Sequence, residues 1–156
     1  MAALKTDYAD GDTVHAAALN AWDTAINAST DYLAGTTAAA TLKNPTITSY
    51  VESPVAIGTV TTTCTIDLTN GTVQTATLTA STGCTFTMPT CTSGKSFVLL
   101  LKQAATTGNG TATFTSVKWP TAGAPTITAT AAKMDILTFI ADGTNWYGSY
   151  LQGYTP

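Results

Sequence analysis

The stretch at residues 134–151, MDILTFIADGTNWYGSYL, decides the fold class. Residues 134–141 form an apolar run of strand length, rich in side chains that favour strands. The dipeptide Asp142-Gly143 is common in tight turns, because Gly tolerates positive φ and Asp hydrogen-bonds to the nearby backbone. Residues 146–151 then predict a second strand. Two strands around a short turn indicate a β-rich fold.

The same pattern of strands and turns runs upstream as far as residue 46. Residues 84–88 alternate strictly between apolar and polar, and residues 97–101, FVLLL, predict a strand buried on both faces. Strands that recur about every ten residues are typical of a sandwich or jelly roll. The sequence therefore predicts a mainly β fold, with an antiparallel β-sandwich or jelly-roll-like domain over residues 44–156. The expected strands cover residues 46–52, 55–68, 72–80, 84–88, 95–103, 111–119, 126–130, 134–141 and 146–151.

The dipeptide Asn70-Gly71 predicts a hairpin, because both residues accept the positive φ of a two-residue turn. That pairing places Ile66 and Leu78 on opposite faces of the hairpin. Either a bulge shifts the register, or both faces of the hairpin are covered.

Residues 1–43 differ from the rest and predict an acidic arm, a short α-helix over about residues 16–33, and a linker. Gly35 follows the helix as a stop signal. A helix this short is marginal in water, so its apolar stripe either packs on its own β domain or bundles with copies of itself. The stripe, spaced as in a coiled coil, is the candidate oligomerisation surface and comprises Leu19, Trp22, Ile26 and Leu33.

The composition excludes several classes of function. Thr makes up roughly a quarter of the residues, and charged residues make up only 10%. The chain has no Arg and a net charge of -3, so it lacks the basic surface that a nucleic-acid partner requires. No apolar run reaches the length of a membrane span, and the start shows no secretion signal. We expect synthesis in a reducing cytoplasm and a surface that meets copies or partners in an assembly.

Residues that carry chemistry are few, and their spacing matches no known site. Cys64, Cys84 and Cys91 fit no zinc pattern, and we expect them to pack as small apolar side chains, with a disulfide within or between chains as the alternative. His15 is the only histidine. The carboxylates of the β region show no spacing that singles out a catalytic pair. We therefore expect a protein that is not an enzyme, with no catalytic, cofactor or metal site. Those carboxylates belong to Glu52, Asp67, Asp135 and Asp142.

The aromatic residues gather toward the C-terminus. Exposed aromatic rings bind sugars and proteins, so Trp146, Tyr150 and Tyr154 are candidate ligand contacts. The competing interpretation places Trp119 and Trp146 in the core and the tyrosines at its rim.

Two parts of the chain resemble known proteins. Residues 10–21, DGDTVHAAALNA, resemble the N-terminal helix of many phage fibre proteins. Residues 45–151 resemble a β module that recurs in virion proteins of tailed bacteriophages. The motifs that carry this second resemblance are FTMP at 86–89, GKSF at 94–97, VKWP at 117–120, DILTF at 135–139 and DGTNWYG at 142–148.

The resemblance implies a structural protein on the virion surface, assembled in the cytoplasm of the bacterial host. Such proteins are homotrimers that attach through the N-terminus to other virion proteins of the capsid or tail. At 156 residues the chain is expected to be a short head fibre, a capsid decoration protein or a tail appendage. A host-surface glycan is the further partner expected if the C-terminal aromatics bind a receptor.

Overall fold

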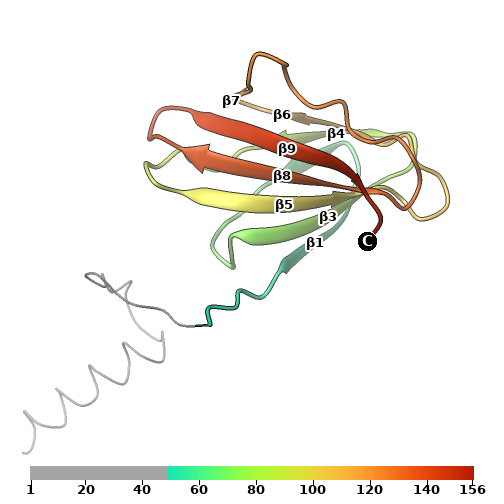
Figure 1. Cartoon of the computed structure of the whole chain (residues 1–156), viewed down its shortest axis with the longest axis horizontal. Helices are drawn as coiled ribbons and strands as arrows, with labels where there is room; N and C mark the ends of the chain where they lie inside the picture. The colour runs from blue at the N-terminus through green and yellow to red at the C-terminus, as the bar shows by residue number, and fades with distance from the viewer. Residues whose placement is uncertain (1–48) are drawn as a thin grey trace, which may run out of the picture. The chain divides into compact units, whose positions relative to one another are not determined.

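The computed structural model describes residues 49–156, which form one compact unit. The predicted arm, helix and linker lie outside the described residues, and so do Leu19, Trp22, Ile26 and Leu33. The described part is mainly β, as predicted, and has no helix (Figure 1). Its nine strands are β1 Val55–Val60, β2 Thr63–Thr65, β3 Val73–Leu78, β4 Gly83–Thr87, β5 Ser96–Lys102, β6 Thr111–Phe114, β7 Val117–Lys118, β8 Met134–Ala141 and β9 Trp146–Tyr154.

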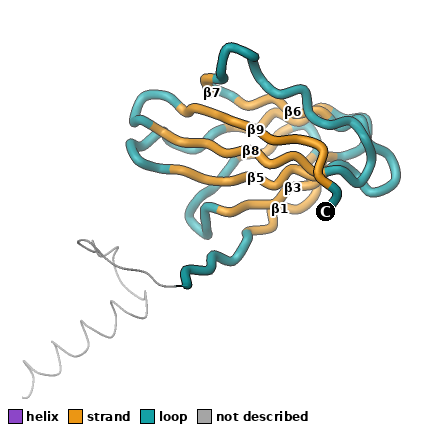
Figure 2. Tube along the Cα trace, in the orientation of Figure 1, coloured by secondary structure: helices purple, strands orange, loops and turns teal. Residues whose placement is uncertain are grey.

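The first six strands alternate between two sheets. Strands β1, β3 and β5 pair in parallel in one sheet, and β2, β4 and β6 pair in parallel in the other. Each pass of the chain thus adds one strand to each sheet, and three passes make a solenoid-like stack. Figure 2 shows β9, β8, β5 and β3 one below another in the front layer, with β6 in the layer behind, near β9 in this view.

Strands β8 and β9 extend the larger sheet to the order β1-β3-β5-β8-β9-β7. Strand β8 is antiparallel to both β5 and β9, and the turn at Asp142 joins β8 to β9 as predicted. The Asp142 Oδ1 atom accepts hydrogen bonds from the backbone N–H groups of Thr144 and Asn145, each at 2.7 Å. Gly143 has a φ of 100°, a value that glycine adopts without strain.

The predicted antiparallel sandwich needs correction, because antiparallel pairing is confined to β5–β8 and β8–β9. The other five strand pairs are parallel. Alternation of apolar and polar residues indicates that a strand has one buried face, but it does not identify the neighbouring strand. The parallel partners here come from successive passes of the chain, so no turn motif between them predicts the pairing.

The predicted hairpin at Asn70-Gly71 is also wrong, because β2 and β3 belong to different sheets. The separation resolves the conflict in the sequence pattern. Ile66 and Leu78 are both buried, each reaching the core from its own sheet. Neither a bulge nor a cover on both faces is needed.

The core lies between the inner faces of the two sheets. Phe97 stacks on Phe139 with ring centroids 4.6 Å apart, and Phe86 stacks on Phe114 at 5.1 Å. Phe114 also contacts Phe139 at 5.3 Å, so the aromatic cluster spans both sheets. The buried apolar residues are Val60, Ile66, Ala76, Leu78, Cys84, Phe86, Phe97, Leu99, Leu101, Ile127, Leu137, Phe139, Ala141 and Trp146.

The buried carboxylate of Asp135 on β8 connects the loop before β8 to the end of β9. Asp135 is 1% exposed, and its Oδ2 atom accepts a hydrogen bond from the Thr128 N–H at 2.8 Å. Its Oδ1 atom accepts one from the Gly153 N–H at 2.9 Å. The side chain of Gln152 donates a third, at 3.2 Å. These three donors satisfy the two oxygen atoms of a buried polar group.

Candidate functional site

The three aromatic residues predicted as ligand contacts do not share one exposed surface. Trp146 is 2% exposed, lies edge-on to Phe97 at 5.4 Å, and donates its indole N–H to the Pro89 carbonyl at 2.9 Å. Tyr150 is half-buried against Trp119, with ring centroids 5.9 Å apart. Tyr154 is 40% exposed near the C-terminus. Trp146 therefore belongs to the core, as the competing interpretation predicted.

The carboxylates of Asp67 and Asp142 accept hydrogen bonds that stabilise the adjacent turns. The pKa of Asp142 is lowered because its carboxylate accepts hydrogen bonds from the backbone N–H of Asn145, then of Thr144, and from the Tyr147 hydroxyl. The pKa of Asp67 is lowered chiefly by the backbone N–H of Thr69. Within residues 49–156, no group of three or more His, Cys, Asp or Glu residues could hold a metal ion.

The carboxylate of Glu52 ties the segment before β1 to the start of β3. It accepts hydrogen bonds from the Thr72 hydroxyl, from the backbone N–H groups of Val73 and Thr72, and from the Tyr50 hydroxyl. The Thr72 hydroxyl is the largest cause, and together these donors lower the pKa of Glu52 to about 2.

We expect Glu52 to titrate near pH 2 in the folded chain, well below its ordinary pKa of 4.5. Its contribution to stability is then fully present above pH 4.5 and is lost as the pH falls toward 2, because protonation removes the better acceptor. An NMR titration of the side-chain carboxyl measures the midpoint, and Glu52→Gln is the control for assignment. A midpoint at 4.5 would contradict these hydrogen bonds.

The cysteines lie in or against the core, as predicted. Cys84 is buried, while Cys64 and Cys91 are half-buried and pack against the core, and all three are free thiols. Burial is the largest cause that raises the pKa values of the Cys64 and Cys84 thiols. A raised pKa leaves little reactive thiolate at neutral pH.

The outer face of the six-stranded sheet carries large apolar side chains on adjacent strands. Leu100 pairs with Ile136, which pairs with Leu151, and Ile140 pairs with Tyr147. Leu151 is 63% exposed, Ile140 57% and Tyr147 44%. We call this surface the apolar face and define it as Val73, Val98, Leu100, Ile136, Thr138, Ile140, Tyr147, Ser149 and Leu151.

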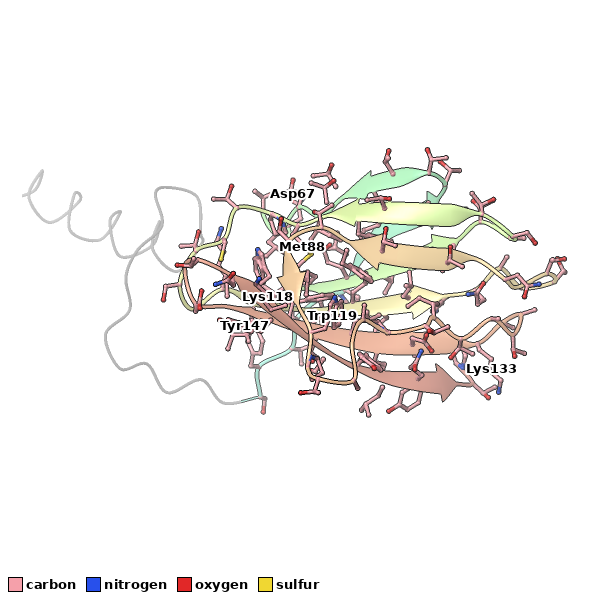
Figure 3. The ribbon with its side chains drawn as sticks, turned by 90° about the horizontal axis from the view of Figure 1, so that it is seen from above. Asp67, Met88, Lys118, Trp119, Lys133 and Tyr147 are labelled. Atoms are coloured by element: carbon pink, nitrogen blue, oxygen red, sulfur yellow. The ribbon has the colours of Figure 1, made fainter. Side chains whose placement is uncertain are left out.

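A hollow of about 390 Å³ indents the apolar face. Ser96, Thr138, Ile140, Tyr147 and Ser149 are among the residues that line it. Figure 3 shows Tyr147 and Lys133 toward opposite ends of the described β unit. The apolar face thus combines protruding side chains with a recess, and the hollow contains no charged residue in its lining.

The outer face of the three-stranded sheet is chemically different. Thr63, Thr85 and Thr113 lie side by side on successive parallel strands, and the Thr113 hydroxyl donates to the Thr85 hydroxyl at 3.2 Å. Thr65 and Thr87 form the next row. This ordered array of hydroxyl and methyl groups, which we call the threonine face, is well suited to contact with water.

No helix in the described part is long and apolar enough to cross a membrane. Comparisons with known proteins found no matching family model, no matching curated protein and no matching solved structure.

Proposed function

We propose that this chain is a structural protein of a tailed-bacteriophage virion, a short homotrimer attached by its N-terminus. Its place would be as a head fibre, a capsid decoration protein or a tail appendage on the virion surface. The observation that carries the proposal is the apolar face, because an exposed apolar surface on a sheet marks a contact with another protein. The virion assignment rests on the motifs of residues 10–21 and 86–148.

The roles of the carboxylates support a structural function over catalysis. Glu52, Asp67, Asp135 and Asp142 each accept hydrogen bonds from nearby backbone N–H groups. A general acid or base needs a carboxyl group that is available to a substrate. Here the same groups fasten loops to strands, which suits a rigid module for display.

The division of the chain supports attachment through its first part. Residues 1–43 supply the proposed attachment segment, with the stripe Leu19, Trp22, Ile26 and Leu33 as a three-helix bundle around the trimer axis. Residues 44–156 supply the module presented outward, and its partners are copies of itself and other capsid or tail proteins. The glycan-receptor alternative has less support, because Trp146 is buried and only Tyr154 of its three proposed contacts is well exposed.

We expect light scattering of the purified full chain to give three times the 16.0 kDa mass of one copy. Changing Leu19, Trp22 and Ile26 together to Ser should lower that mass, because polar side chains remove the apolar seam of the bundle. Matched changes at Ala17 and Ala28, which lie off the stripe, should leave the mass unchanged. A 16.0 kDa species at high concentration would contradict the homotrimer.

Gold-labelled antibodies against the chain test the virion assignment directly. We expect label on purified phage particles, and its position on capsid or tail then distinguishes decoration protein from tail appendage. Particles without label, from lysates that contain the chain, would contradict the assignment.

A further inference from the structure

We infer that the apolar face is a contact between copies of this chain, which joins the β modules through the outer surface of their six-stranded sheets. This inference rests on the homotrimer of the proposed function and adds to it a second interface, separate from residues 1–43.

The makeup of the sheet favours a cover over this face. Parallel strands usually lie in sheets that are covered on both sides, and β5 carries the continuous apolar run FVLLL of such a strand. Phe97, Leu99 and Leu101 fill the core, while Val98 and Leu100 point outward and are only half-buried. In the described part of the chain, nothing lies over them. The run therefore predicts a second layer outside the single module.

The charge distribution favours a second copy as that layer. The rows that cross the sheet through Val98 and Leu100 contain no charged residue. Lysines appear only at the margins of the face, where Lys118 on the edge strand β7 lies beside Tyr147 and Lys102 pairs with Met134. The uncharged centre of the face can meet a second copy with no like-charge repulsion, whereas it offers no electrostatic recognition to a charged partner.

The shape of the apolar face also favours association between copies. In a cyclic trimer each copy gives one patch to one neighbour and a different patch to the other, so a face that supplies both patches must hold a protrusion and a recess. Ile140 and Leu151 protrude, with more than half of each side chain exposed. The hollow on the same face has Thr138, Ser149 and Ile140 in its lining. One copy can thus place an aliphatic side chain in the recess of the next.

Paired lysine substitutions on the two outer faces test the inference in the full chain. The test variant is Ile140→Lys with Leu151→Lys, and the matched control is Thr85→Lys with Thr113→Lys on the threonine face. All four side chains point outward, so both variants keep the core. Sedimentation equilibrium gives the dissociation constant of each, and circular dichroism on heating checks the fold. A second variant, Ile140→Ser with Leu151→Ser, removes the apolar contact without adding charge.

We expect the Ile140/Leu151 lysine variant to raise the dissociation constant of the oligomer at least roughly 100-fold, because lysines would meet across the contact. The serine variant should weaken association less, and the threonine-face control should match the unmodified chain.

Equal association of all variants would overturn the inference. If the Leu19/Trp22/Ile26 variant alone dissociates, the inference fails while the homotrimer stands. An unmodified chain that is a monomer overturns both. An Ile140/Leu151 variant with an unchanged oligomer mass but a larger hydrodynamic radius would also overturn the inference. Residues 1–48 of the same chain would then be the cover of the apolar face.

Discussion

Replacing Trp146 by Ala is expected to lower the free energy of unfolding by about 3–5 kcal/mol. The indole is 2% exposed and fills the end of the core beside Phe97, so its removal leaves a large cavity. The Pro89 carbonyl also loses the indole N–H that it accepts at 2.9 Å. Urea denaturation followed by far-UV circular dichroism measures the change.

Tyr154→Ala is the matched control for this experiment, because Tyr154 is an exposed aromatic residue on the same strand. Its loss should change the free energy of unfolding by less than about 1 kcal/mol. The pair also separates the two interpretations of the C-terminal aromatics. If Trp146→Ala left stability unchanged and abolished binding of the particle to cells, the glycan-receptor alternative would gain and the core assignment would fail.

Replacing Asp135 by Ala is expected to cost about 3 kcal/mol or more, because two backbone donors lose their acceptor inside the protein. These donors are the N–H groups of Thr128 and Gly153, at 2.8 and 2.9 Å from the carboxylate. The first lies in the loop before β8 and the second lies near the end of β9, so the variant loosens the open end of the hairpin, opposite the turn. Hydrogen exchange at these two amides reports the local effect, and urea denaturation reports the global one.

Asp135→Asn provides an intermediate case. It keeps the shape and one acceptor oxygen, but its NH₂ group faces an N–H donor, so we expect a smaller loss than for Ala. Asp67→Asn is a control in an exposed loop, where the carboxylate accepts from Thr69 alone and water can replace it. Unchanged stability of Asp135→Ala would show that this carboxylate does not organise the end of the sheet.

The parts of the fold that are local in sequence could be predicted, and the others could not. The β8–β9 hairpin follows from one turn and two adjacent strands. The stack of β1 to β6 joins Thr75 to Leu100 and Thr63 to Thr85, partners that lie about twenty residues apart with no signal in between. Residues 126–130 were expected as a strand but form a loop, because the Thr128 N–H is bound by Asp135 instead of by a neighbouring strand.

The location of Trp146 could also have been predicted. Across the turn it pairs with Ala141, which shares its face of β8 with the buried Leu137 and Phe139. Alternation along residues 134–141 already separates that face from Ile136 and Ile140. The apolar face was harder to find, because alternating and continuous apolar patterns meet in one sheet.

The alternation of strands between the two sheets has a consequence for the rate of folding. A parallel pair such as β3–β5 forms only after the chain between the two strands has closed into a long loop, and loop closure slows folding. The β8–β9 hairpin has no such delay and is expected to form within microseconds. Strand β5 would then pair with β8 at the edge of this hairpin. Strands β3 and β1 would follow one at a time. Folding would therefore proceed from the C-terminal end toward β1, opposite to the direction of synthesis, and the first strands to leave the ribosome would be the last to find partners.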